Sequence, residues 1–351
     1  MVRDGAPFGH CDFPLHQRLV VESNLKCSRL ALFALLICTL TTFARADWPA
    51  RVFVPYLYLG NGDHFKMTDC DDAIGVKHYT LAFVIADRQN EPAWYGRVPM
   101  SQNLYGDQIA SIRQRSGDVI CSFGGEAGRE LAIAETDEAK LQAKYQAVID
   151  QYHFTWLDFD IEGNNLSKNP DASKRRNTVL AALQKKNPGL MITYTLPVSP
   201  DGLSQASSDL LRDAKAKGIK VHSANIMVMY FGMRRLQEGK KESDLCVQAA
   251  NSTHAQLQQI DPSIQIGLCP CIGTNGKSGE IFTTDDAKVL RAFADKNPWV
   301  CSLSYWSINR DSKTNHGPDT TAGIPQQPWD FAKLFKSFHP GVGPASSPFT
   351  R

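Results

Sequence analysis

The stretch WLDFDIEG, from Trp156 to Gly163, carries an acid at every second position: Asp158, Asp160 and Glu162. Successive side chains of a β-strand point to opposite faces, so the three acids share one face and large apolar residues occupy the other. Large apolar side chains that pack against helices are typical of the strands of a parallel sheet. The pattern therefore predicts a central parallel strand that carries a row of carboxyl groups.

Seven further runs rich in apolar and β-branched residues lie on either side of this strand and alternate with amphipathic helical stretches. The eight expected strands are residues 52–59, 79–86, 119–124, 156–161, 191–197, 224–230, 264–269 and 300–307. The clearest helical stripe consists of Leu141, Tyr145, Val148, Ile149 and Tyr152. No linker or change of composition divides residues 47–339. We therefore predict the α/β class and a single (β/α)8 barrel over these residues, in preference to a doubly wound open sheet.

In such a barrel the acids of the fourth strand point inward near the C-terminal mouth. Three like charges on one buried face cannot all ionise at low cost, so we expect at least one to hold a proton near neutral pH. Glu162 is the outermost acid and the candidate proton donor, with Asp160 beside it. An exposed acidic edge would not explain the apolar residues between them, and a metal site would need further acids or histidines at other strand ends. We predict a catalytic site without metal or cofactor.

The overall charge argues against a polyanionic partner. The 351 residues include 38 Lys plus Arg and 36 Asp plus Glu, with no long run of either sign, and 42% of the residues are hydrophobic. This balance is typical of a globular protein and does not indicate nucleic acid or an anionic membrane surface as a partner. The sequence favours a neutral ligand, and we expect a monomer.

Both ends of the chain differ from its middle. Lys26 and Arg29 precede an apolar run over residues 30–43, which closes on Ala44-Arg45-Ala46, a small-x-small cleavage pattern. The run is short for a membrane span, so we predict a signal peptide within residues 1–46, cleaved near Ala46, and a secreted protein without a stable membrane anchor. An uncleaved anchor is the alternative. Residues 340–351 are expected to form a flexible tail.

Six cysteines follow the predicted cleavage position. Export would allow some of them to pair, but their spacing matches neither a redox motif nor a zinc motif. We interpret them as buried small apolar residues. They are Cys70, Cys121, Cys246, Cys269, Cys271 and Cys301.

Several strand-end motifs occur together with the Asp-x-Asp-x-Glu row, in the order of a known family. The third expected strand ends in Ser122-Phe123-Gly124-Gly125, and the eighth carries Trp306-Ser307-Ile308-Asn309. The fifth and sixth carry Tyr194-Thr195-Leu196-Pro197 and Asn225-Ile226-Met227. With these motifs the chain resembles the family 18 glycoside hydrolases, the chitinase family, and in particular compact bacterial chitinases.

The resemblance implies a substrate-assisted retaining mechanism on a 2-acetamido sugar. Glu162 would protonate the glycosidic oxygen, Asp160 would hold the acetamido group, and Asp158 would tune Asp160 from beneath. Chitin or oligosaccharides that contain N-acetylglucosamine would be the substrate, cleaved at β-1,4 linkages.

The resemblance also implies residues that bind the sugar. Trp306 matches the tryptophan beneath the distorted sugar, and Met227 belongs to the sixth-strand motif. Tyr56 and Phe83 could line the same subsite, although aromatic residues in barrel strands often serve packing alone. Where the family normally has an aspartate on the sixth strand, this chain has Tyr230, which could donate a hydrogen bond but supplies no negative charge near neutral pH.

Two other functions are compatible with the same residues. The change at Tyr230 mildly favours a catalytically silent lectin that binds chitin-like glycans, whereas the presence of Glu162, Asp160 and Asp158 argues against it. The second alternative is an endo-β-N-acetylglucosaminidase that acts on N-glycan cores or peptidoglycan.

Overall fold

The computed structural model describes residues 48–60, 65–236, 239–276, 279–312 and 321–338, all within the unit that runs from Ala46 to Arg351. The predicted signal peptide over residues 1–46 and the tail over 340–351 lie outside the described residues. Among the helices described, none combines the length and apolar character that a membrane crossing requires.

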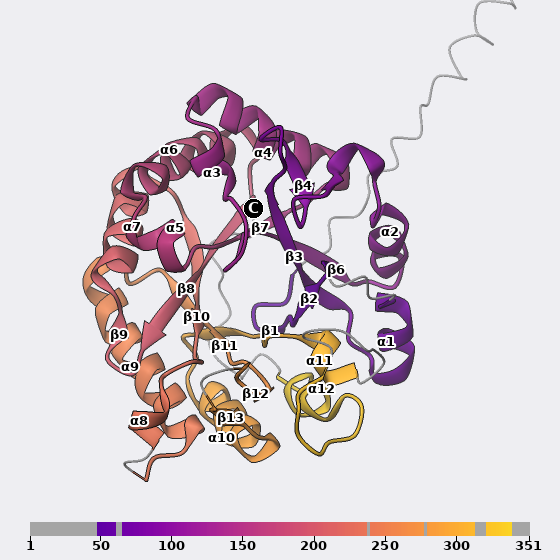
Figure 1. Ribbon diagram of the computed structural model, residues 1–351, viewed down its shortest axis with the longest axis vertical. Helices are drawn as coiled ribbons and strands as arrows, with labels where there is room; N and C mark the ends of the chain where they lie inside the picture. Colours follow the sequence, from indigo (N-terminus) through magenta and orange to yellow (C-terminus); the bar gives the residue numbers. More distant parts are fainter. Residues whose placement is uncertain (1–47, 61–64, 237–238, 277–278, 313–320, 339–351) are drawn as a thin grey trace, which may run out of the picture. The chain divides into compact units, whose positions relative to one another are not determined.

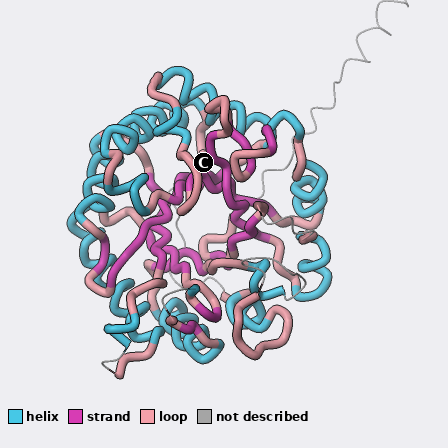
Figure 2. Tube along the Cα trace, in the orientation of Figure 1, coloured by secondary structure: helices cyan, strands magenta, loops and turns pink. Residues whose placement is uncertain are grey.

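The strands form a closed ring with helices around it (Figures 1 and 2). The hydrogen-bonded order is β3-β6-β7-β8-β10-β11-β14, and all these neighbours are parallel. β1 pairs with β14 and β2 pairs with β3, so the segment 52–58 closes the ring as its eighth member. The members are β1 (Val52–Phe53) with β2 (Tyr56–Tyr58), β3 (His78–Ala86), β6 (Asp118–Gly124), β7 (Trp156–Asp160), β8 (Met191–Ser199), β10 (Val221–Met227), β11 (Gln265–Cys269) and β14 (Val300–Leu303). The predicted (β/α)8 barrel is confirmed.

Helices cover the outer face of the ring, and their apolar stripes pack against the outward side chains of the strands. Each buried Leu, Ile or Phe in this layer contributes about 1.5–3 kcal/mol of transfer free energy. The predicted stripe of α4 is buried along its whole length. The helices are α1 (Met67–Ile74), α2 (Gly106–Gln114), α3 (Leu131–Ala134), α4 (Glu138–Tyr152), α5 (Gly163–Ser167), α6 (Pro170–Lys186), α7 (Gln205–Ala216), α8 (Met233–Leu236), α9 (Glu242–Ile260), α10 (Thr284–Lys296), α11 (Ile308–Ser312) and α12 (Asp330–Phe335), and η1 (Met100–Gln102) is a 3-10 turn.

Short strands outside the ring extend its loops. β4 and β5 add antiparallel pairs beside β3, β9 pairs with the end of β8, and β12 and β13 form a separate hairpin after β11. Their bounds are β4 (Pro92–Trp94), β5 (Val98–Pro99), β9 (Gly202–Leu203), β12 (Gly273–Thr274) and β13 (Ile281–Phe282). Because β12 and β13 follow the C-terminal end of β11, this hairpin belongs to the loops of the barrel mouth.

The inside of the barrel changes character from one end to the other. Near the N-terminal ends of the strands, an apolar layer is formed by Val52, Val54, Ile120 and Trp156. Near the C-terminal ends, a second apolar cluster includes Tyr56, Ala82, Met229, Cys269 and Cys271. The side chains between these two layers are polar. Buried polar residues such as Ser122, Asp158 and Thr195 therefore occupy the middle of the barrel, below the apolar cluster at the mouth.

The sixth strand ends earlier than predicted. The expected strand covered residues 224–230, but β10 covers Val221–Met227. Val228 still donates its N–H to the Cys269 carbonyl at 3.0 Å, and the backbone then turns, because Tyr230 has a φ of 57° in the left-handed region. The apolar sequence continues past this turn, so hydrophobicity alone could not locate the end of the strand.

The prediction for the six cysteines is confirmed. All six are buried, and none of the six is joined to another by a disulfide. They serve as small apolar residues within the packed layers, as expected for free cysteine in a protein interior.

Candidate active site

The acidic row lies along β7 and the residues that follow it. Asp158 and Asp160 expose 2% and 4% of their surface, while Glu162 is half-buried and directly precedes α5. Phe159, between the first two acids, is fully buried in the outer core against the helices. The alternation expected from the sequence therefore separates acids on the inside from apolar side chains on the outside.

Asp158 is held by hydroxyl groups from three other strands. Its Oδ2 accepts hydrogen bonds from Tyr56 Oη at 2.8 Å and Ser122 Oγ at 2.6 Å, and its Oδ1 accepts from Thr195 Oγ1 at 2.7 Å. Burial raises the pKa of Asp158 to about 6, and these hydrogen bonds oppose the rise because they favour the charged form. Asp158 is therefore fixed in position and predominantly ionised at neutral pH.

A further layer of polar contacts supports these donors. Asn225 on β10 donates from Nδ2 to Thr195 Oγ1 at 3.0 Å and to Tyr56 Oη at 3.3 Å. Ser304 in turn donates from Oγ to Asn225 Oδ1 at 3.3 Å. Side chains from β2, β8, β10 and the segment after β14 thus form one network around the base of the acidic row.

Asp160 and Glu162 lack such compensation. Burial, together with the negative charges of Glu162 and Asp158, raises the pKa of Asp160 well above its usual range, and Asp160 Oδ1 has no hydrogen-bond partner within the described part of the chain. Burial and the nearby charge of Glu126 raise the pKa of Glu162 to about 7. Because two close carboxylates in a desolvated site resist ionising together, this pair retains one proton near neutral pH.

An aromatic cluster lies beside the acidic row. Phe83 and Trp306 are partly buried and stack with ring centroids 5.6 Å apart and an interplanar angle of 8°. The rings of Tyr56 and Tyr58 lie 6.0 and 5.4 Å from Trp306, and Met227 packs against the same cluster. Tyr56 connects the aromatic cluster with the acidic row, since its ring belongs to the cluster and its hydroxyl donates a hydrogen bond to Asp158. The partly exposed faces offer an apolar surface next to the acids.

Tyr230 is the most exposed of the predicted site residues. It exposes 56% of its surface, and its Oη lies 4.0 Å from Cys271 Sγ. The structure therefore places it on the rim of the mouth. The other seven predicted residues, namely Asp158, Asp160, Glu162, Trp306, Phe83, Tyr56 and Met227, line or support the mouth itself.

Sequence reasoning did not assign roles to the donors around Asp158. Ser122, Thr195 and Asn225 occurred within the strand-end motifs, but no function followed from them. The signal that could have found them was a small polar residue in an otherwise apolar strand, at the height of the acidic row. Among the described residues, no group of three or more His, Cys, Asp or Glu side chains has an arrangement that could hold a metal ion.

The fold and the site together define a class. A (β/α)8 barrel that carries paired carboxyl groups at the end of its fourth strand, next to an apolar aromatic surface, has the parts of a glycosidase active site. Comparison with known proteins makes this more specific. No family model matches the chain.

Two curated relatives share about three tenths of their aligned residues with the chain. The "Probable bifunctional chitinase/lysozyme" of Escherichia coli (strain K12) is 29% identical over 313 residues, which is 83% of this chain and 35% of the relative. "Endochitinase 11" of Metarhizium anisopliae is 30% identical over 282 residues, which is 75% of this chain and 53% of the relative. The chain thus spans between a third and about half of the length of these two relatives.

A solved structure supports the same relationship. The catalytic domain of the hyperthermophilic chitinase from Pyrococcus furiosus superposes with a TM-score of 0.73 at 28% identity, covering 83% of this chain and 95% of that domain. The present chain belongs to family 18 of the glycoside hydrolases.

Proposed function

We propose that the protein hydrolyses β-1,4 linkages between N-acetylglucosamine units, in chitin or its oligosaccharides, by a substrate-assisted retaining mechanism. The observation that carries the proposal is the uncompensated pair Asp160 and Glu162 above a fixed Asp158. A pair that retains one proton near neutral pH can give this proton to a leaving group and take one back from water.

The first half of the reaction breaks the glycosidic bond. Glu162 donates its proton to the glycosidic oxygen while the acetamido oxygen of the substrate forms a bond to the anomeric carbon. The positive oxazolinium ion that results is stabilised by the negative charge of Asp160, which is ionised while Glu162 holds the single proton of the pair. Asp158, held by three hydroxyl groups, adds a fixed negative charge beneath Asp160.

The second half restores the enzyme. Glu162, now ionised, removes a proton from a water molecule that attacks the anomeric carbon, and the bond between that carbon and the acetamido oxygen breaks. Two successive inversions leave the anomeric configuration unchanged. Trp306 and Phe83 support the sugar ring through its apolar C–H face.

The relatives support the proposed substrate. Both curated relatives are named as chitinases, and catalytic-site mutants of the Pyrococcus furiosus domain were solved in complex with chito-oligosaccharides. We infer that this chain binds the same class of neutral oligosaccharide as a monomer, without nucleic acid or a membrane anchor as partner.

The test compares the protein with its Glu162→Gln variant on a fluorogenic chitobioside and chitotrioside. We expect the variant to lose about 10²–10⁴-fold in kcat/KM, the usual contribution of a general acid. Glu126→Gln serves as the matched control, because it removes an exposed acid at the same mouth and should retain activity. Equal rates for the protein and Glu162→Gln would remove the catalytic assignment, and binding without turnover by both would indicate the lectin.

One alternative substrate has specific support. The name of the Escherichia coli relative includes lysozyme, which makes peptidoglycan a second candidate. A 2-acetamido group occurs in both polymers, so the same acids could act on either. Release of reducing ends from purified peptidoglycan and from colloidal chitin, measured side by side, separates the two. Glu162→Gln should abolish whichever activity is present.

We also propose that the protein is exported. The support is the apolar run over residues 30–43, which closes on the small-x-small pattern Ala44-Arg45-Ala46. N-terminal sequencing of protein recovered from outside the cytoplasm should give a chain that begins near Asp47. A mature chain that begins at Val2 would contradict this proposal.

A further inference from the structure

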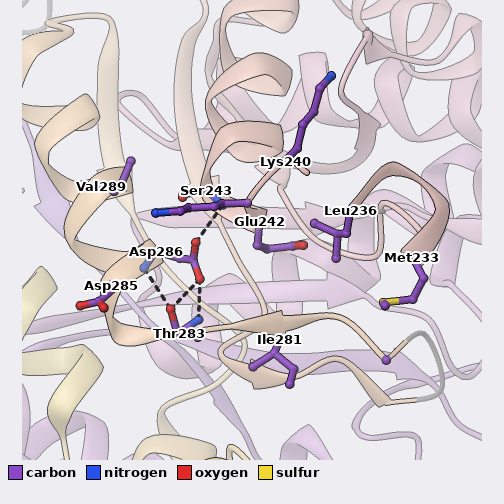
Figure 3. Close-up of a pocket in the computed structure, with 12 residues that line it drawn as sticks. Met233, Leu236, Lys240, Glu242, Ser243, Ile281, Thr283, Asp285, Asp286 and Val289 are labelled. Atoms are coloured by element: carbon purple, nitrogen blue, oxygen red, sulfur yellow. Dashed lines mark hydrogen bonds between the residues drawn. The ribbon is translucent and has the colours of Figure 1, made fainter. Parts of the chain in front are cut away.

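A cavity of about 490 Å³ lies on the rim of the barrel mouth, among the loops that follow β10 and β11. Its lining residues come from α8, the start of α9, the β12–β13 hairpin and the start of α10 (Figure 3). The acidic row of β7 and Trp306 do not line it. It is therefore a separate hollow on the same face of the barrel as the candidate active site.

One acid in this cavity has no hydrogen-bond partner among the residues that the structure describes. Glu242, the first residue of α9, exposes only 3% of its surface, and neither of its carboxyl oxygens has a hydrogen-bond partner in the described structure. Figure 3 shows its side chain pointing towards Leu236, with Met233 and Ile281 on the other side of the hollow. The Oγ of the neighbouring Ser243 is also buried without a partner. A buried carboxyl group in this state costs free energy that a suitable ligand would recover.

The acids around Glu242 are occupied elsewhere. Asp286 accepts hydrogen bonds from Ser243 N–H at 3.1 Å and from Thr283 Oγ1 at 2.6 Å, and Glu280 accepts from Gly232 N–H. Both acids are buried, so they add negative potential at Glu242. Lys240 and Lys241 line the outer part of the cavity, and Lys240 points away from Glu242 in Figure 3. In the described structure no ion pair reaches the Glu242 carboxyl group.

Part of the cavity rim is apolar. Five large apolar side chains are exposed in the described part of the chain, and three of them, Met233, Ile281 and Val289, line this cavity. A fourth, Tyr230, lies just before α8. Such a concentration marks a binding surface for a ligand with an apolar face. Since the Glu242 oxygens are buried, the ligand must displace neighbouring side chains, which the flexible thioether of Met233 permits.

We propose that this cavity is a subsite for a primary ammonium group on a sugar ring, that is, a 2-amino sugar whose amine pairs with Glu242. The C–H face of such a ring would cover Met233 and Ile281, and the ammonium group would satisfy the unpartnered carboxylate. A deacetylated unit within a partly acetylated chain and the free amino sugar share this chemistry. Binding of a deacetylated unit rests on the proposed function, since the polysaccharide would have to extend from the active site to the rim.

Binding has a defined proton balance. Burial and the negative charges of Glu280 and Asp286 raise the pKa of Glu242 to about 8. Below this pH the empty cavity holds a neutral carboxyl group. An incoming ammonium ion forms an ion pair only with the ionised group, so the Glu242 proton is released to solvent. Among the described residues, the other charged side chains that line the cavity are Asp285, Asp286, Lys240 and Lys241.

The test is calorimetric titration of the full chain with the glucosamine disaccharide, the free glucosamine monomer and the N,N′-diacetylated disaccharide. We expect Glu242→Gln to weaken binding of both amines by at least about tenfold and to leave binding of the diacetylated sugar unchanged. Tighter binding of the disaccharide than of the monomer would indicate that the site binds a unit of a polysaccharide and not the free amino sugar. Asp285→Asn is the matched control, because it removes an exposed acid from the same rim, and it should bind like the unmodified protein.

A second readout needs no variant. Titration at about pH 6.5 in two buffers of different ionisation enthalpy should show the release of ~1 proton per amine bound. Unchanged amine affinity in Glu242→Gln, an equal loss for the diacetylated sugar, or binding without proton release would overturn the proposal. Hydrolysis of the fluorogenic chitotrioside is measured in parallel: its absence from the unmodified protein would refute the proposed function and leave the amine titration to be read by itself.

Discussion

Glu130 and Asp160 are both buried acids of this barrel, and they differ in what faces the carboxyl group. Glu130, directly before α3, forms an ion pair with Arg176 of α6 at 2.9 Å, and both side chains are fully buried. Tyr145 of α4 donates a further hydrogen bond to it at 3.0 Å. Asp160 has acids as its charged neighbours and one oxygen without a partner. A compensated acid holds helices together, whereas an uncompensated one can bind a proton or a cation.

Glu242 belongs with Asp160 in this comparison. Both are almost completely buried, and both have a raised pKa because burial is reinforced by negative neighbours. Their surroundings differ, since Asp160 lies above a network of hydroxyl donors and Glu242 lies beneath aliphatic side chains. The first arrangement suits a proton that is exchanged during a reaction, and the second suits a cation that is bound.

The largest expected effect follows from breaking the compensated pair. Arg176→Met leaves Glu130 as a buried uncompensated charge, which should lower the free energy of unfolding by about 3–5 kcal/mol. Denaturant unfolding followed by circular dichroism measures this. Arg212→Met is the control: its ion pair with Asp209 is exposed, and such pairs contribute about 0–1 kcal/mol. Equal effects of the two substitutions would show that compensation at Glu130 is not what stabilises the helices.

Replacement of the uncompensated acid Asp160 should reduce activity strongly and leave stability unchanged or higher. Asp160→Asn removes a group that stabilises the oxazolinium ion, so we expect kcat on the fluorogenic chitotrioside to fall about 10²-fold. The unfolding midpoint should stay the same or rise, because the amide is less costly to bury than a carboxylate. A fall in stability comparable to that of Arg176→Met, with activity retained, would assign Asp160 to the structural class.

The smallest expected effect is a shift in the pH dependence of kcat/KM when Glu126, whose charge acts on Glu162, is replaced. The first step needs Glu162 protonated, and the pKa of Glu162 is raised to about 7, so kcat/KM should fall as the pH rises through this value. Glu126→Gln removes a negative charge that favours the protonated form. The basic limb of the profile should therefore move to lower pH, by less than about one unit for a solvent-exposed charge. A shift to higher pH would show that the Glu126 charge does not raise the pKa of Glu162.

The sequence predicted the barrel because its strands are nearly continuous apolar runs and its acids interrupt one of them with a period of two. It could not predict the pair of Glu130 and Arg176, since Glu130 precedes α3 and Arg176 lies 46 positions further along the chain, on α6, with no shared periodicity. Glu242 was missed for a similar reason. Its neighbours Glu280 and Asp286 come from separate elements that only the folded chain brings together.

In the candidate site, too, residues within one segment were predictable from the sequence, whereas contacts between segments were not. The row Asp158, Asp160 and Glu162 was evident because its members follow one another at every second position of one short stretch of sequence. The donors that fix Asp158 come from β2, β6 and β8, and Tyr56 was assigned to subsite lining without its hydrogen bond to Asp158 being foreseen. Tyr230 was placed in the sixth strand, whereas its positive φ takes it to the rim. Local patterns revealed the acids, but contacts between strands determine how their charges behave.

The central claim is that Glu162 gives its proton to the leaving group, and the dependence on the leaving group tests it most directly. An activated fluorogenic aryl group depends less on protonation than a sugar alcohol, which departs only when protonated. We measure kcat/KM of the protein and of Glu162→Gln on a fluorogenic chitobioside and on the unmodified N-acetylglucosamine tetramer. The account predicts a defect at least about tenfold larger on the tetramer. Equal defects on both substrates would contradict it.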